Sequence, residues 1–324
     1  MLLALDGTEA VSISVRAFER DDEPAALDVL RGSFGKWPRG IGGVSPEECF
    51  RWKHYECPFG PSMLLVAEAD GKIVGFQGRM QWRLTSGTEV LETMRGADLA
   101  VHPAYRGHGV SLAIRRAARF APQIAFTWSN PNPQSKPGSS KFGRREVAAA
   151  TRYIRVHRWP TRFARPRPLV GAPSAATVLA DSERIAHLLG EQSRDPRLRT
   201  ERSVEYLRWR YGHLPGYHAI ATDDGLAIFR VKRHRSFWFA DVCEILTATR
   251  SPNEASGVLR RVRQAAEVNL TCCCFPSQRE AARCGFIRWP SHDVLMVTTL
   301  HPGLSPDPTR RAAWSLSRGD LELI

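Results

Sequence analysis

The fold is decided by one stretch of sequence, Ala97-Asp98-Leu99-Ala100-Val101-His102-Pro103-Ala104-Tyr105-Arg106-Gly107-His108-Gly109-Val110-Ser111. The alternating apolar residues up to Val101 predict a strand, and the residues after Gly109 predict an amphipathic helix. The turn between them holds two glycines, which lack the Cβ atoms that would keep a phosphate away from the backbone. Because the first amides of a helix have no partner inside it, we expect them to bind a diphosphate together with Arg106.

The same turn could be an ordinary connection between a strand and a helix, with no ligand. It does not fit a dinucleotide-binding motif, because that motif needs a third glycine three residues after Gly109, where Leu112 stands. The Val-x-Pro lead-in, the arginine and the apolar helix together favour another phosphate-bearing ligand.

The stretch resembles the signature of the GNAT superfamily of acetyltransferases, a strand of the form L-x-V-x-P-x-x-R-G-x-G before an apolar helix. One residue departs from the longer signature, Ser111, where glycine or alanine is preferred. The resemblance covers about residues 11–156, and near the turn it is also similar to acetyltransferases of polysaccharide gene clusters. The matching residues are Leu99, Val101, Pro103, Arg106, Gly107 and Gly109.

The resemblance implies that the chain binds acetyl-CoA as acyl donor and transfers the acetyl group to a primary amine of a small molecule. It also implies a bulge in the strand, whose backbone pairs with the pantetheine arm and faces the reacting carbonyl. The cofactor-binding residues that it implies are Leu99, Ala100, Val101, Arg106, Gly107, His108, Gly109, Val110, Ser111 and Asn132.

Two residues are candidates for the catalytic proton transfers. Family members carry an asparagine, seven residues later a tyrosine that protonates the leaving thiolate, and four residues later a glycine. Asn132 and Gly143 keep this spacing, but Ser139 replaces the tyrosine, so coenzyme A leaves with another acid, as the thiolate, or slowly. Asp98 and Glu92 share one face of the strand, and Asp98 is the candidate base because it is nearer the expected bulge. The other interpretation of Asp98 is a carboxylate paired with Arg95 or Arg106.

The second half of the chain repeats the first. Arg51-Trp52-Lys53 aligns with Arg208-Trp209-Arg210, and each copy continues with an Asp-Gly hairpin turn and a strand that leads toward a helix. The alternative is two unrelated segments with a coincidental Arg-Trp. Since the second copy lacks a glycine pair ahead of its helix, we expect it to bind no coenzyme A and to border the acceptor site.

These patterns predict an α+β chain of two tandem GNAT-like domains, each a mixed, mostly antiparallel twisted sheet flanked by helices. Residues 146–156 are expected to form the last strand of the first domain. The predicted divisions are 11–156 for the acetyl-CoA-binding domain, 157–174 for a Pro- and Arg-rich linker, 175–300 for the degenerate domain and 301–324 for a C-terminal tail.

The composition predicts a globular, cytoplasmic protein. The 324 residues include no apolar run long enough to cross a membrane, and the start lacks the basic region of a secretion signal. Seven cysteines, three of them adjacent at Cys272-Cys273-Cys274, favour neither a disulfide framework nor a metal site. The net charge of +13 fits an incidental arginine-rich surface or a polyanionic partner.

Two other functions fit parts of the sequence. A tandem transferase that uses aminoacyl-tRNA would suit the positive charge and the basic residues 152–167, although such enzymes generally lack an intact coenzyme A turn. Nucleic acid is therefore a possible partner but not the favoured one. A non-catalytic module, with acetyl-CoA at most a structural ligand, would suit the missing tyrosine.

Overall fold

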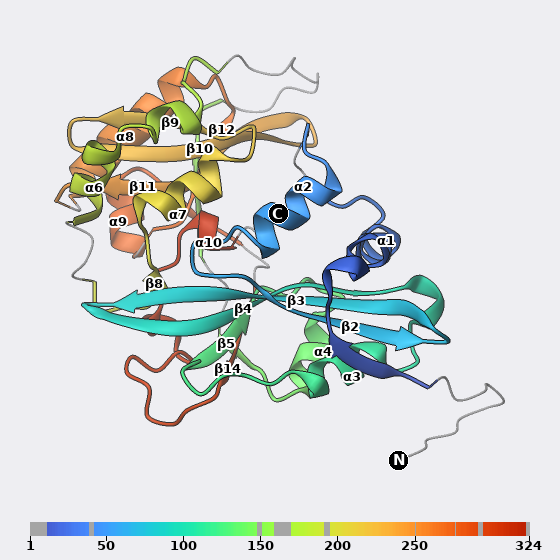
Figure 1. The fold of residues 1–324 in the computed structure, drawn as a ribbon. Helices are drawn as coiled ribbons and strands as arrows, with labels where there is room; N and C mark the ends of the chain where they lie inside the picture. Colours follow the sequence, from blue (N-terminus) through green and yellow to red (C-terminus); the bar gives the residue numbers. More distant parts are fainter. Residues whose placement is uncertain are drawn as a thin grey trace.

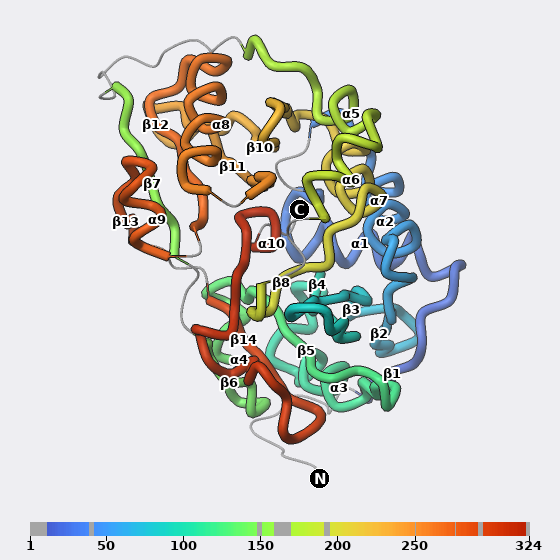
Figure 2. Tube along the Cα trace, turned by 90° about the vertical axis from the view of Figure 1, so that its left-hand side faces the viewer, coloured from blue at the N-terminus to red at the C-terminus, as the bar shows by residue number. Residues whose placement is uncertain are grey.

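Two sheets lie one above the other, and the short C-terminal helix α10 (Arg318–Leu321) lies between them (Figures 1 and 2). The computed structural model describes residues 12–38, 42–147, 151–158, 170–190, 195–249, 251–275, 277–290 and 294–321. Within these ranges, every helix is too short or too polar to cross a membrane.

The first sheet has eight strands in the described residues, and all neighbours are antiparallel except β4 and β5. The hairpin between β2 and β3 turns at Asp70 and Gly71, whose φ values of 51° and 69° are the left-handed pair that a tight hairpin requires. In spatial order the strands are β1 (Ser14–Ala17), β2 (Met63–Ala69), β3 (Lys72–Ser86), β4 (Glu89–Val101), β5 (Phe126–Ser129), β14 (Leu295–Thr299) and β6 (Arg145–Val147), with β8 (Arg199–Thr200) beside β3.

The second sheet repeats this plan with six strands in the described part, of which only β11 and β12 are parallel neighbours. The predicted class, two mixed and mostly antiparallel sheets flanked by helices, is confirmed. In spatial order the strands are β13 (Ile287–Trp289), β7 (Arg152–Val156), β12 (Leu270–Cys273), β11 (Phe237–Thr247), β10 (Gly225–His234) and β9 (His218–Thr222).

The two sheets exchange a strand, which the sequence did not lead us to expect. Residues 146–156, predicted as one strand, are divided: β6 pairs with β14 in the first sheet, whereas β7 pairs with β12 and β13 in the second. β14, in turn, lies in the predicted second domain but completes the first sheet. The sheets therefore do not follow the predicted boundaries, because a strand's own residues fix its pattern but not its partner. Most of the predicted linker 157–174 lies outside the described residues.

Helices cover both faces of the first sheet (Figure 1). α1 (Glu23–Phe34) and α2 (Pro46–His54) lie on the face toward the second sheet, and α3 (Val110–Ala117) and α4 (Lys136–Lys141) lie on the opposite face. Val110 and Ile114 form the buried side of α3 against β2 and β3. The other helices are α5 (Ala175–Val178), α6 (Ser182–Gly190), α7 (Val204–Leu207), α8 (Pro252–Ala265) and α9 (Gln278–Arg283).

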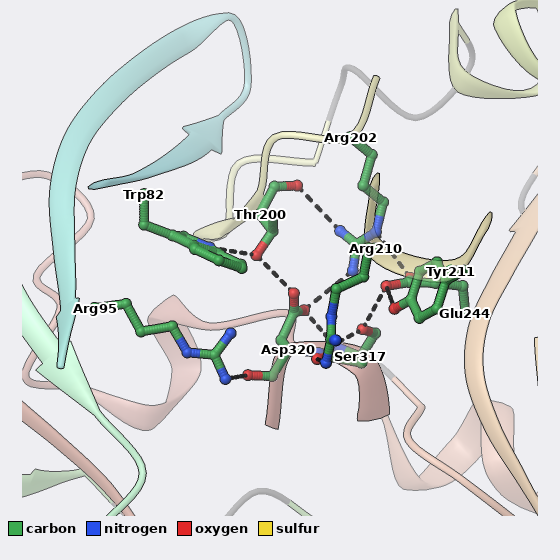
Figure 3. Close-up of polar contacts among 10 residues, drawn as sticks. Trp82, Arg95, Thr200, Arg202, Arg210, Tyr211, Glu244, Ser317 and Asp320 are labelled. Carbon is green, nitrogen blue, oxygen red and sulfur yellow. Dashed lines mark hydrogen bonds and ion pairs between the residues drawn. The ribbon is translucent and has the colours of Figure 1, made fainter. Parts of the chain in front are cut away.

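Residues 301–324, which we predicted to be a tail, enter the core in their later part, where Ala313 and residues 318–321 are buried and Ser317 and Asp320 make polar contacts (Figure 3). The fully buried carboxylate of Asp320 accepts a hydrogen bond from Thr200 Oγ1 at 2.6 Å and pairs with Arg202 at 3.0 Å. Arg202 also pairs with Glu244 of β11 at 2.8 Å, while Arg95 of β4 donates to the carbonyl of Asp320. The segment thus ties the two sheets together through buried hydrogen bonds and ion pairs.

Candidate active site

Residues Arg106–Gly109, here called the phosphate turn, lead from β4 toward α3. Gly107 and Gly109 have φ values of 86° and 81°, in the left-handed region that glycine adopts without strain. A Cβ at either glycine would meet no atom within 4 Å, and all four residues of the turn are exposed. Arg106 is fixed beside the turn by donating to the carbonyl of Ser33 at 3.1 Å. The turn is an open surface at the start of a helix.

The first amides of α3 are not capped. The N-cap position is Gly109, which has no side chain to offer, and the first turn of the helix holds no acidic residue. Among the described residues, no side chain accepts from the amides of Val110, Ser111 or Leu112. Unpaired amides at the positive end of a helix dipole favour an anion.

The corresponding helix of the second copy, α8, starts differently. The hydroxyl of Ser251 accepts from the amide of Asn253 at 3.2 Å, and Glu254 lies in the first turn, where it accepts from the amide of Thr249 at 3.0 Å. A phosphate would have to displace the serine and would be repelled by the carboxylate.

β4 and β5 separate shortly after they begin to pair. Their parallel register runs only from Thr93–Phe126 to Arg95–Trp128, whereas β4 continues to Val101. Residues 96–101 therefore have β3 on one side and no β5 partner on the other. These residues include the predicted Leu99, Ala100 and Val101, so their free edge can pair with an extended ligand.

The bulge that the resemblance implied is present in β4. Ala97 lies opposite Gly78 and Ala100 lies opposite Phe76, so that Asp98 and Leu99 together face the single residue Gln77. Asp98 has a φ of 48°, a left-handed value that is uncommon outside glycine. A bulge of this kind bends the strand and redirects its backbone groups.

Asp98 lies in a buried ion pair. Its Oδ2 is 2.7 Å from Lys53 Nζ and 3.2 Å from His54 Nε2, and Trp37 donates to its Oδ1 at 3.4 Å. Burial raises the pKa of Asp98, but Lys53 and His54 outweigh burial and hold that pKa below its ordinary value. A carboxylate in this state is a weak base. The contacts match its predicted alternative role as a paired carboxylate, with Lys53 in place of Arg95 or Arg106, and its role as base stays a prediction.

Ser139 is buried in α4, with only 1% of its surface exposed, and its hydroxyl donates to the carbonyl of Ser135 at 3.1 Å. Asn132 is exposed and accepts from the amide of Ser135 at 2.8 Å, so it shapes the turn before α4. The proton of Ser139 is therefore engaged within its own helix. A part for Ser139 in the reaction stays a prediction.

The sequence analysis did not predict that Lys53 and His54 contact Asp98. Lys53 and His54 are almost fully buried, and burial lowers the pKa of His54, which keeps its ring neutral. One signal was present: Lys53 and Arg210 hold the same position in the two copies of the repeat, and both are buried cations. Their partners could not be read from a sequence because Asp98 lies far along the chain.

Comparisons with known proteins point to one family. Residues 32–135, which contain the bulge, the phosphate turn and Asn132, match the model of the acetyltransferase (GNAT) family. No curated protein matches the chain.

Solved structures share the architecture of about nine-tenths of the chain. A GCN5-related N-acetyltransferase from Kribbella flavida has 14% identity and a TM-score of 0.60, with 90% of this chain and 72% of that chain covered. A conserved protein of unknown function from Enterococcus faecalis V583 has 14% identity and a TM-score of 0.64, covering 89% and 73%. A GCN5-related N-acetyltransferase from Anabaena variabilis has 13% identity and a TM-score of 0.60, covering 90% and 73%. The fold is thus that of GCN5-related N-acetyltransferases, and residues 32–135 are similar to the GNAT family model.

Proposed function

We propose that the chain is an acyl-CoA-dependent N-acyltransferase, for which acetyl-CoA is the simplest donor and a primary amine of a small molecule is the acceptor. The observation that carries the proposal is the uncapped start of α3, which directly follows an exposed turn with two left-handed glycines. It lies on the same strand connection as the bulge, so one ligand can reach both. The family match supports the class of reaction.

The phosphate turn would hold the donor by its diphosphate. The amides that follow Gly109 and the guanidinium of Arg106 supply donors and positive charge at this point. The free edge of residues 99–101 would pair with the amide groups of the pantetheine arm. Such pairing would bring the thioester to the bulge at Asp98 and Leu99, where redirected backbone groups can stabilise charge on the carbonyl oxygen.

The reaction needs positioning more than side-chain chemistry. The amine nitrogen bonds to the thioester carbon, the carbon–sulfur bond breaks, and the sulfur leaves with the electron pair. The amine gives up one proton and the thiolate takes one, both exchanged with water. We assign Asp98 to holding the bulge through Lys53, and we propose that coenzyme A leaves as the thiolate because Ser139 has no free proton to give.

The second copy would not bind a donor of its own. A cavity of about 330 Å³ lies where β11 and β12 separate, at the place that corresponds to the donor site of the first copy. The C-terminal segment lines this cavity with Ser317 and Arg318, and Arg318 pairs with Asp241 of β11 at 3.0 Å. The position of the C-terminal segment in this cavity and the capped start of α8 both favour a second copy that borders the acceptor and binds no donor.

Thermal unfolding with acetyl-CoA tests the donor site. The free energy of unfolding should rise by about 2.7 kcal/mol at a hundredfold excess over the dissociation constant. Release of coenzyme A over a panel of amines then tests the reaction. Steeply salt-dependent binding of tRNA without any response to acyl-CoA would support the aminoacyl-tRNA transferase instead. Binding of acetyl-CoA with no release for any amine would favour the non-catalytic module.

A further inference from the structure

Three arginines gather on the face of the first sheet that α3 and α4 cover, and we call them the arginine cluster. Arg79 lies on β3 directly opposite Gly96 of β4, Arg115 lies on α3, and Arg144 follows α4. Arg144 Nη1 donates to Ser129 Oγ at 2.7 Å and lies 3.9 Å from the position that a Cβ would take at Gly96. The cluster is therefore at the point where β4 and β5 separate.

The arginine cluster has no acidic partner in the described part of the chain. Arg79 is 3% exposed, its buried Nε has no hydrogen-bond partner, and its one acceptor is Gln77 Oε1 at 3.1 Å. The guanidinium of Arg115 lies over the ring of Phe142, 5.4 Å from the ring centre.

The three like charges act on one another. Burial first, and then Arg144 and Arg115, lower the pKa of Arg79 to about 9, while burial and Arg115 lower the pKa of Arg144 to about 10. Charge buried without an opposite charge is costly, and guanidinium groups arranged in this way are suited to a carboxylate or a phosphate. A bound anion would remove the cost.

The position of the arginine cluster along β4 indicates which part of a bound donor an anion there would belong to. Gly96 precedes the bulge at Asp98 by two residues, which is about 7 Å of strand, whereas the phosphate turn begins only at Arg106, beyond the other side of the bulge. Gln77, which accepts from Arg79, is the residue that faces the bulge. An anion bound at the cluster would therefore lie past the thioester and away from the diphosphate, and it would not be a phosphate of the coenzyme.

The face of the first sheet on which the arginine cluster lies indicates whether the anion would belong to the donor or to the acceptor. Arg79 points to the side covered by α3, since its guanidinium lies over Phe120 at 5.1 Å, just after that helix. Asp98 instead contacts Lys53 and His54 of α2, on the opposite face. The arginine cluster thus shares its face with the helix of the phosphate turn, which is the donor's side.

We propose that the arginine cluster binds a carboxylate at the far end of the acyl group, so that the preferred donor is the coenzyme A thioester of a dicarboxylic acid, such as succinyl-CoA. This inference rests on the proposed function, because the bulge holds a thioester only if the chain binds an acyl-CoA. The far carboxylate takes no part in bond changes: the amide bond forms, the carbon–sulfur bond breaks, and the product is an amide with a free carboxylate.

The experiment compares succinyl-CoA with butyryl-CoA, which has the same length and a methyl group in place of the carboxylate. Calorimetric titration of the whole chain should show succinyl-CoA bound about 10- to 100-fold more tightly, as expected for charge-assisted hydrogen bonds. Arg79→Met and Arg144→Met should each abolish most of this preference and leave the affinity for butyryl-CoA within about twofold. Arg288→Met, at an exposed arginine of the second sheet, is the matched control and should keep the preference.

Each outcome separates the two proposals. Equal affinity for both thioesters overturns the carboxylate site and leaves the acyltransferase proposal standing, whereas binding of neither overturns both. A preference unchanged in the arginine variants also counts against the cluster. If coenzyme A release is instead faster with amino acids than with the matching amines, and depends on Arg79, the carboxylate belongs to the acceptor. Should Arg79→Met fail to fold, Arg144→Met decides, because its arginine is less buried.

Discussion

The indole of Trp52 donates a hydrogen bond to the carbonyl of Trp209 at 2.7 Å, and the indole of Trp209 donates to the carbonyl of Trp52 at 2.9 Å. The two rings are stacked, with centroids 4.9 Å apart and an angle of 17° between their planes. The two residues hold the same position in the two copies of the repeat. A contact in which each partner makes the same bond to the other is what a two-fold relation between the copies produces.

Trp52→Phe and Trp209→Phe should destabilise the protein by similar amounts, about 1–3 kcal/mol each, because each leaves one buried carbonyl without its donor. Urea unfolding of the single and double variants measures both the losses and their coupling. The double variant should lose less than the sum of the two, since the rings share one contact. Strongly unequal single losses would contradict the two-fold relation.

Gly107→Glu should abolish binding of acetyl-CoA, because it places a negative side chain on the surface expected to receive the diphosphate. Gly216→Glu is the matched control: the φ values are 86° and 87°, and neither position has an atom within 4 Å of an added Cβ. Both variants carry the strain of a left-handed residue, about 1–2 kcal/mol. Calorimetry should find binding lost only in the first, and binding retained there would refute the phosphate turn.

Replacing Asp98 by Asn should cost about 3–5 kcal/mol of stability, because it leaves the buried ammonium of Lys53 without its charged partner. The double variant Lys53→Met, Asp98→Asn should recover part of that loss in chemical unfolding. A different result, full stability with turnover reduced and acetyl-CoA affinity unchanged, would restore Asp98 as the catalytic base.

The same carboxylate predicts how stability depends on pH. The pKa of Asp98 lies below its ordinary value of 3.8 in the folded chain, so its contribution is complete above that pH and is lost as the pH falls toward the folded value. Urea midpoints should therefore drop below about pH 4, and less steeply in Asp98→Asn. A parallel drop in both proteins would assign the acid sensitivity to other groups, such as Asp241 and Asp320, whose pKa values are also lowered.

Asp320→Ala should lower the melting temperature by several degrees, because it leaves the buried guanidinium of Arg202 with one carboxylate in place of two. The control is Asp307→Ala, at a partly exposed carboxylate that contacts Thr309 and Arg310 close to it along the chain. Calorimetric scans of both variants compare the effects. Equal melting temperatures would mean that the C-terminal segment does not hold the two sheets together.

The sequence was sufficient to predict those features that depend on residues close together along the chain. The two-glycine turn, the Asp70-Gly71 hairpin, the helix after Gly109 and the bulge beside Asp98 all follow from local pattern or from a motif. The repeat was visible from an Arg-Trp pair that is followed in each copy by an Asp-Gly turn and a strand.

What the sequence could not show depends on contacts made across the fold. Lys53 reaches Asp98 only because α2 packs on the bulge, and nothing in either residue's surroundings along the chain marks the pair. The arginine cluster was hidden for a different reason: Arg79, Arg115 and Arg144 are three of 46 basic residues, so none stood out until the fold brought them together.

Because β7 and β14 are exchanged, each half of the chain contributes a strand to the sheet of the other half. A chain cut at the linker would leave the first sheet without the strand that joins β5 to β6, and the second without the strand that joins β12 to β13. The copy that lacks a phosphate turn is therefore not dispensable, because it supplies a strand beside the wall of the donor site. Deletion of either half would leave a gap within the sheet of the other half, which gives the second copy a structural role apart from any ligand.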